Sequence, residues 1–244
     1  MKSIILGRNA VHEAIKSGRY IDKLFISKTS KGVGSLVSDA KAVGAVIKFV
    51  DAEKLNIYGE NHQGVVALSS PVPYLDVEDI LSLAKEKGEA PFIIICDGIE
   101  DPHNLGALIR TAEAVGAHGL VIPKRRSVSV TPIVEKTSAG AVSLMPIARV
   151  SNLASSIDKL KKEGIWVYCA DMNGETWYDV NLSGAIALVI GSEGRGVGHL
   201  IKQKCDGIIS LPMNGKINSL NASVAGGILM YEILRQRNYV KIKN

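Results

Sequence analysis

The stretch Ile186-Ala-Leu-Val-Ile-Gly191-Ser-Glu-Gly-Arg-Gly-Val-Gly198 joins an apolar run to a loop that holds four glycines in eight residues. Further along, a second apolar run, Ile208–Leu211, leads into Pro212 and Met213. The glycine loop lacks the third glycine of G-x-G-x-x-G, and the chain has no G-x-x-x-x-G-K run, so neither phosphate-binding pattern applies. Strands that are apolar on both faces are typical of a parallel sheet, in which ligands bind beyond the carboxyl ends of the strands. The two loops therefore predict a cofactor pocket.

The apolar runs on either side of these loops predict an α/β protein. Beyond Pro91, five runs have the length and composition of buried strands, and helical segments separate most of them. The five expected strands are Phe92–Cys96, Gly119–Ile122, Trp166–Ala170, Ile186–Ile190 and Ile208–Leu211. Before residue 70, a smaller α/β sandwich is predicted from helices near residues 10–17 and 34–43 and from strands near 23–27, 46–50 and 65–68.

Charge and proline placement divide the chain into two domains. Residues 1–70 hold ten Lys and Arg against six acidic residues, residues 71–90 hold two against five, and residues 91–244 hold seventeen against thirteen. The acidic stretch is bracketed by prolines and contains one short apolar patch with helical spacing. We therefore expect a first domain at 1–72, a linker at 73–90 and a second domain at 91–244.

Bulk properties favour a cytoplasmic protein. The net charge of +5 permits nucleic-acid binding without demanding it. Cys96, Cys169 and Cys205 lack the short spacings of zinc or redox motifs, and we expect them to be reduced core residues. We expect neither export nor a membrane span, because the N-terminus lacks a signal-like apolar region and no apolar run approaches the length of a bilayer.

Three ordered motifs in the second domain resemble those of the SPOUT class of RNA methyltransferases, in the SpoU/TrmH-like branch that methylates the ribose 2'-hydroxyl. The first motif is Asp97–Ala112, which contains the run from Asn104 to Arg110, and the second is Gly191–Gly196. The third extends from Leu211-Pro212-Met213 to Asn221–Ala225. The resemblance covers nearly the whole chain, and three motifs in order are far more specific than one.

The resemblance implies a SPOUT domain with a deep trefoil knot, which hydrophobic spacing does not reveal, preceded by an L30e-like RNA-binding domain. It also implies S-adenosylmethionine as cofactor, RNA as substrate and a homodimer whose active sites are completed across subunits. The expected reaction is 2'-O-methylation of a guanosine in 23S ribosomal RNA. No DNA or membrane partner is expected.

The candidate catalytic residues lie in the three motifs. The family's pattern makes Arg110 the activator of the ribose hydroxyl, and because arginine stays protonated in proteins, we expect it to orient a phosphate and stabilise charge. Asn104 stands where a helix cap is expected, and capping alone could account for it. Glu193 could accept a hydrogen bond from the ribose or pair with Arg195 or Arg110. Two further polar side chains, which could bind the acceptor nucleotide or cap the last helix, are Ser219 and Asn221.

The cofactor is expected against the glycine loop and the third motif. Glycine allows a backbone to approach a flat ring closely. The residues that the resemblance assigns to the cofactor are Gly191, Gly196, Leu211, Met213 and Leu220.

The expected RNA contacts are basic residues. Lys124, Arg125 and Arg126 form the densest basic cluster and follow the carboxyl end of a strand, which favours phosphate contact over a merely solvated face. Three weaker candidates in the first domain are Arg8, Lys28 and Lys31. The five histidines are too dispersed for a metal site, and we expect no metal.

Several alternatives stay open on the sequence. The acceptor could be transfer RNA or a ribosomal adenosine. From a different class, the chain could be a non-catalytic RNA-binding or ribosome-assembly protein, and sheet architecture alone would also allow a dinucleotide-dependent dehydrogenase, which the missing glycine fingerprint disfavours. The last helix is expected from Ser219 to about Arg237. The small residues near its start fit a dimer interface, a knot crossing or close packing within one chain.

Overall fold

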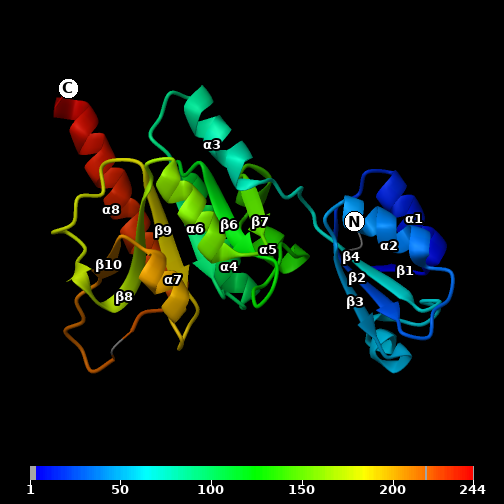
Figure 1. Cartoon of the computed structure of the whole chain (residues 1–244). Coiled ribbons are helices and arrows are strands. Elements are labelled where there is room, and N and C mark those ends of the chain that lie inside the picture. The colour runs from blue at the N-terminus through cyan, green and yellow to red at the C-terminus, as the bar shows by residue number, and fades with distance from the viewer. Residues whose placement is uncertain (1–3, 218, 244) are drawn as a thin grey trace. The chain divides into compact units, whose positions relative to one another are not determined.

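A computed structural model describes residues 4–217 and 219–243, with side chains up to residue 238. The chain divides into two compact units (Figure 1). One comprises Met1–Pro73 together with Ser129–Pro132, and the other comprises Tyr74–Val128 and Ile133–Asn244. No helix among the described residues is long and apolar enough to cross a membrane.

The first unit is a four-stranded mixed sheet with two helices on one face. Its strands lie in the order β1-β4-β2-β3, and only β2 and β3 run parallel. Leu24 and Ile26 of β2 pack into a core with both helices, whereas Phe25 points the other way and stacks on Tyr58 with ring centroids 5.3 Å apart. The elements are β1 Ile4–Leu6, α1 Arg8–Lys16, β2 Ile21–Ser27, α2 Gly34–Ala42, β3 Val46–Val50, the 3-10 helix η1 Ala52–Tyr58 and β4 Val65–Ser69.

The second unit is built on a six-stranded sheet in which every strand pair is parallel. The strand order is β10-β8-β9-β5-β6-β7, so the chain order reverses between β5 and β9. This confirms the predicted α/β class and parallel sheet. The trefoil knot stays a prediction of the resemblance. The strands are β5 Phe92–Asp97, β6 Gly119–Pro123, β7 Ile147–Val150, β8 Trp166–Thr176, β9 Ile186–Gly191 and β10 Gly207–Ser210.

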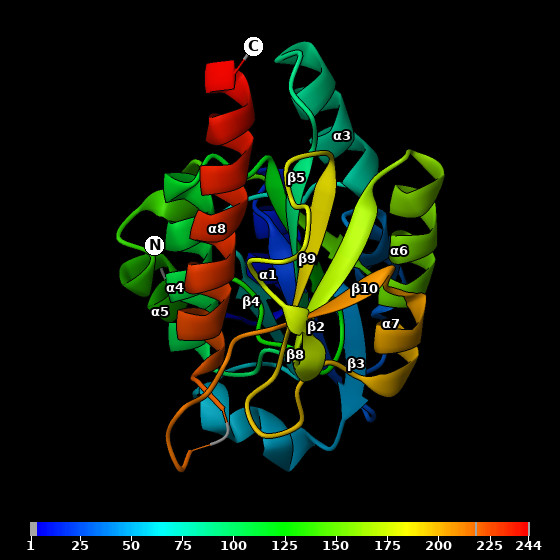
Figure 2. The ribbon, with the colours of Figure 1, turned by 90° about the vertical axis from the view of Figure 1, so that its left-hand side faces the viewer.

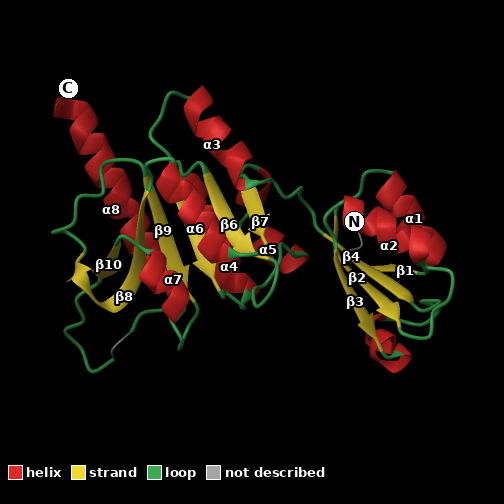
Figure 3. Ribbon diagram, viewed as in Figure 1, coloured by secondary structure: helices red, strands yellow, loops and turns green. Residues whose placement is uncertain are grey.

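Helices cover both faces of this sheet (Figures 2 and 3). On one face, α3, α6 and α7 bury apolar side chains against the strands. On the other, α4 packs against α8, and a Cβ atom added to Gly226 of α8 would lie 2.6 Å from Leu108 of α4. Close packing within one chain therefore explains this small residue. The helices are α3 Val77–Glu86, α4 Pro102–Ala114, α5 Pro132–Thr137, the 3-10 helix η2 Ala141–Ser143, α6 Leu153–Lys162, α7 His199–Lys204 and α8 Ala222–Lys243.

The segment expected as a linker contains a helix that belongs to the second unit. Asp76 and Asp79 form a capping box at the start of α3, and Val77 and Ile80 are buried in the core beneath the sheet. Gly119 lets Ile80 approach closely, because an added Cβ atom would lie 2.5 Å from it. The apolar patch in this acidic stretch thus anchors α3 to the second unit.

Candidate functional site

The loops that follow β5, β6 and β9 meet at one edge of the sheet. Asp97 at the end of β5 lies in register with Gly191 at the end of β9. The next residue, Gly98, has a φ of 72°, and a Cβ atom placed there would be 3.7 Å from both the Arg126 carbonyl oxygen and the Ser192 Cβ. The first motif, the second motif and the basic cluster therefore converge where the strand order reverses, which is the ligand-binding position of open α/β sheets.

The loop of the second motif folds back on its own strand. Ser192 and Gly196 exchange two backbone hydrogen bonds, of 3.1 and 2.8 Å. A Cβ atom at Gly191 would lie only 2.1 Å from the Gly196 carbonyl carbon, so no other residue fits there without moving the backbone. Beyond the loop, the Gly198 amide donates to Asp97 Oδ2 at 2.8 Å, which ties the second motif to the first.

A ring of three side chains joins all three motifs. Asn104 Nδ2 donates to Glu193 Oε1 at 3.0 Å. Asn221 Nδ2 donates to Asn104 Oδ1 at 2.9 Å and also to Glu193 Oε1. Asn104 is 6 % exposed, whereas Glu193 and Asn221 are exposed. The ring therefore has a buried base and an outer rim that a ligand can reach.

Two of the alternatives that the sequence left open for these residues are wrong. Asn104 is not a helix cap, because α4 begins at Pro102 and Asp101 caps it by accepting from the His103 amide at 2.9 Å. Glu193 pairs with neither Arg195 nor Arg110, since Arg195 reaches Glu100 instead, at 3.3 Å.

Asn221 caps the last helix as well as joining the ring. Its Oδ1 accepts from the backbone amides of Ser223 and Val224 at 2.9 and 3.2 Å. The helix accordingly starts at Ala222, later than expected, and extends to Lys243. The capping alternative is thus confirmed for Asn221, while Ser219 lies exposed before the cap.

Arg110 is exposed on α4, two turns beyond the first residue of the helix. Among the described side chains, no acceptor takes a hydrogen bond from its guanidinium, and Glu113 does not pair with it. A cation that is not engaged by the protein itself is available for an anionic ligand such as a phosphate.

A pocket of about 350 Å³ opens beside the third motif, and its size lies within the range of small-molecule sites. Leu211 and Met213 line it, as expected, whereas Gly191, Gly196 and Leu220 do not. Met172 and Asn173 of β8 also line it and were not anticipated. Their position gave a signal, since they lie just beyond the predicted strand Trp166–Ala170, at the end where ligands bind. The full lining is Met172, Asn173, Ser210, Leu211, Pro212, Met213, Gly215, Lys216 and Ile217.

The basic residues that are expected to contact RNA differ in their exposure to solvent. Arg125 and Arg126 are exposed, and Arg126 has an uncommon positive φ of 56° for a non-glycine residue. The loop is held there by the Ile99 carbonyl, which accepts from the Ser127 hydroxyl at 3.0 Å and the Val128 amide at 2.8 Å. Lys124 is half-buried.

In the first unit, Arg8 and Lys28 are already engaged. Arg8 donates to the carbonyl oxygens of Lys31 and Gln63 at 2.7 and 3.4 Å, and so holds two loops together. Lys28 pairs with Asp51 at 2.8 Å, whereas the Lys31 side chain is exposed. Arg8 thus has a structural role in joining these loops, apart from any contact with a ligand.

Together the fold and the site define an α/β protein that carries a ligand pocket, a polar ring and a basic loop beyond the carboxyl ends of the strands of a parallel sheet. The model of the SpoU rRNA methylase family matches residues 91–231, and the model described as RNA 2'-O ribose methyltransferase substrate binding matches residues 4–75. The chain belongs to the SpoU rRNA methylase family and is an RNA methyltransferase.

A Bacillus subtilis relative named as a TrmH family tRNA/rRNA methyltransferase is 49 % identical over 241 residues, covering 97 % of this chain and 96 % of its own. Among solved structures, the SpoU methyltransferase AviRb of Streptomyces viridochromogenes, in complex with AdoMet, has a TM-score of 0.63 at 24 % identity and covers 97 % of this chain and 90 % of its own. The TrmH/SpoU tRNA-modifying enzyme of A. aeolicus has a TM-score of 0.58 at 27 % identity and covers 67 % of this chain and 85 % of its own.

Proposed function

We propose that this protein transfers a methyl group from S-adenosylmethionine to a ribose 2'-hydroxyl of ribosomal RNA in the cytoplasm, and that the acceptor is a guanosine of 23S RNA. The observation that carries the proposal is the ring of Asn104, Glu193 and Asn221, which brings the three motifs of the family to one point. The name of the family's N-terminal model, which matches residues 4–75, supports ribose as the target.

The residues beside the third motif fit the methyl donor. The pocket combines apolar side chains, including Leu211, Met213 and Ile217, with polar groups of Ser210 and Asn173. Such a mixture suits a ligand that has both a flat ring and a charged amino-acid end. Bound there, S-adenosylmethionine supplies a methyl group on a positively charged sulfur. The sharp turn at Gly191 and Gly196 folds the glycine loop back on β9, and we assign the backbone of this loop to the remaining contacts with the donor.

The polar ring and Arg110 are proposed to handle the acceptor. Methyl transfer requires the acceptor oxygen to be held in line and to lose its proton as the new bond forms. Arg110 binds the phosphate next to the target ribose and stabilises the charge that develops on the 2'-oxygen. Glu193, held by two amide groups, accepts a hydrogen bond from the ribose, and Ser219 and Asn221 orient the nucleotide.

RNA binding is assigned to the basic loop and the first unit. Arg125 and Arg126 provide phosphate contacts close to the first motif, with Lys124 at the base of the loop. Lys31 provides a free cation in the first unit, where Arg8 and Lys28 shape the neighbouring surface. A homodimer is part of the proposal, and α8 offers an exposed apolar surface for it through Val224, Ile228 and Tyr231.

Transfer RNA is the second candidate substrate. It is favoured by the name of the Bacillus subtilis relative, which includes both RNA classes, and by the A. aeolicus protein, which is described as a tRNA-modifying enzyme. In this case the same site would act on a ribose in a tRNA loop.

The test is incorporation of a labelled methyl group from S-adenosylmethionine into purified 23S RNA, 16S RNA and bulk tRNA. We expect incorporation into 23S RNA and its loss in Arg110→Ala. Arg110→Lys keeps the charge but not the bidentate geometry and should retain only part of the activity. Full activity in Arg110→Ala would contradict the role of this arginine, and incorporation into tRNA alone would favour the second candidate.

A further inference from the structure

Asp171 directly precedes Met172 and Asn173, which line the pocket, and its carboxylate connects this part of β8 to α7. Asp171 Oδ2 accepts from Lys202 Nζ of α7 at 2.6 Å, and Asp171 Oδ1 accepts from the Asn173 backbone amide at 3.3 Å. The two charged side chains are only 13 % and 30 % exposed. Asp171 therefore joins α7 to the segment of β8 that lines the pocket with Met172 and Asn173.

The same carboxylate lies close to the glycine loop. A Cβ atom added to Gly196 would be 3.6 Å from Asp171 Oδ2, which is ordinary van der Waals contact. One side chain is thus close to both the glycine loop, which follows β9, and the pocket-lining segment, which belongs to β8. Here β8 also departs from regular pairing, because its partner residues in β10 jump from Cys169↔Ile208 to Glu175↔Ile209. The Asp171 side chain helps to hold the intervening residues.

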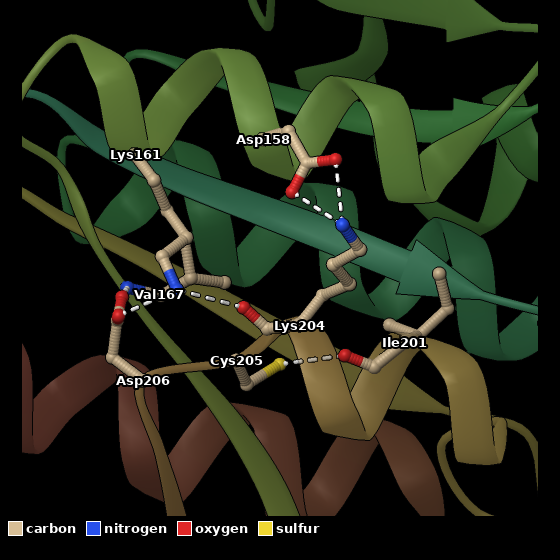
Figure 4. Close-up of polar contacts among 7 residues, drawn as sticks. All are labelled: Asp158, Lys161, Val167, Ile201, Lys204, Cys205 and Asp206. Carbon is tan, nitrogen blue, oxygen red and sulfur yellow. Dashed lines mark hydrogen bonds and ion pairs between the residues drawn. The ribbon is translucent and has the colours of Figure 1, made fainter.

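Helix α7 is fixed by contacts that do not involve Asp171 (Figure 4). Lys204 pairs with Asp158 of α6 at 2.8 Å, and Lys161 of α6 pairs with Asp206 at 2.7 Å. Asp206 also accepts from the Val167 amide of β8 at 2.8 Å. The backbone that carries Lys202 is therefore anchored to α6 and β8, so that Lys202 can hold Asp171 from a fixed position.

The charges of Asp171 and Lys202 stabilise their contact. Burial by itself would raise the pKa of Asp171, but the hydrogen bond from Lys202 and the Asn173 amide outweigh it, and the pKa is lowered from its ordinary value. Asp171 is therefore ionised at neutral pH, and the contact with Lys202 is a charge-assisted hydrogen bond.

We propose that Asp171, held by Lys202, is a positioning residue that sets the β8 wall of the methyl-donor pocket against the glycine loop. The inference rests on the proposed function, because it assigns the pocket to S-adenosylmethionine. Asp171 does not line the pocket, so it acts through Met172, Asn173 and Gly196.

The test is calorimetric titration of the full-length protein with S-adenosylmethionine. We expect Asp171→Asn and Lys202→Met to weaken binding about tenfold, which corresponds to about 1.4 kcal/mol. With RNA as the second substrate, KM for the donor should rise while kcat at saturating donor and KM for RNA stay close to wild type. Lys202→Arg keeps the ion pair and should bind almost as tightly as wild type.

Asp158→Asn is the matched control, since it removes an ion pair of the same helix but leaves the Lys161–Asp206 and Val167–Asp206 contacts, which still hold that end of the helix in place. It should change donor affinity less than twofold. Wild-type affinity in both Asp171→Asn and Lys202→Met, or equal weakening by Asp158→Asn, would overturn the inference. If Asp171→Asn does not fold, the comparison of Lys202→Met with Lys202→Arg decides. A wild-type protein that binds no S-adenosylmethionine would instead overturn the proposed function.

Discussion

The side-chain amide of Asn221 donates to Asn104 Oδ1 at 2.9 Å, although 117 positions separate the two residues in the chain. This hydrogen bond connects the start of α8 to the first turn of α4, and Glu193 closes the ring from the glycine loop. Since α4 and α8 also pack against each other, the helices bring the polar groups to a fixed point. The proposed acceptor site depends on that arrangement.

The variant Asn221→Asp distinguishes the role of Asn221 as a helix cap from its role in the polar ring. The aspartate can still accept from the amides of Ser223 and Val224, so the start of α8 should keep its stability. It loses the donor to Asn104 and places a second carboxylate beside Glu193. We expect methyl transfer to fall at least tenfold in a standard incorporation assay, with little change in melting temperature. Asn221→Ala removes both functions, and it should additionally cost about 1 kcal/mol of stability, seen in urea denaturation.

Gly191→Ala tests the fold-back of the glycine loop. The new methyl group would lie 2.1 Å from the Gly196 carbonyl carbon, and the backbone cannot yield without opening the Ser192–Gly196 pair. We expect a loss of about 1–3 kcal/mol of stability together with weaker donor binding. Gly184→Ala, where an added Cβ meets nothing within 4 Å, should be neutral in both measurements. Equal behaviour of the two variants would show that the loop is not constrained at Gly191.

His118 predicts a pH dependence of stability. It is 3 % exposed, its Nδ1 accepts from the Phe92 amide at 3.0 Å, and burial lowers its pKa from the ordinary 6.5. Below about pH 6.5 the unfolded chain therefore binds a proton that the folded chain does not, and the free energy of unfolding falls as the pH falls. Urea denaturation between pH 7.5 and 5.5 should show this decrease. In His118→Asn, which can accept from the same amide without titrating, the decrease should be smaller.

Arg125→Ala tests the basic loop. Removing a phosphate contact should weaken RNA binding and reduce the slope of log affinity against log salt by about 0.7 for single-stranded RNA. Filter binding at several salt concentrations measures both. Lys162→Ala removes an exposed charge on α6 and serves as the control. An unchanged salt slope in Arg125→Ala would exclude this loop from the RNA interface.

The sequence predicted the parallel sheet because its strands are buried on both faces and appear as uninterrupted apolar runs. It missed β1 and β7, which are only three and four residues long. It placed a linker where α3 lies, because charge and proline dominate that stretch, while the buried contacts of Val77 and Ile80 depend on residues distant in the chain.

The sequence identified the residues of the candidate site, but it did not predict which of them contact one another. Asn104, Glu193 and Asn221 were each selected from their motifs, yet the pairing of Glu193 with two amides in place of an arginine follows from packing of α4 against α8. Asp171, and the contact that Asp97 makes, escaped notice for a related reason. Their partners, Lys202 and the Gly198 amide, are 31 and 101 positions away and follow no periodicity along the chain.

The most direct test of the central claim is to identify the product nucleoside. After incubation of 23S RNA with the protein and S-adenosylmethionine, digestion to nucleosides and mass spectrometry should reveal 2'-O-methylguanosine. Its amount should depend on Arg110. A methyl group found on a base, or no methylated nucleoside from any bacterial RNA although the donor binds, would contradict the account.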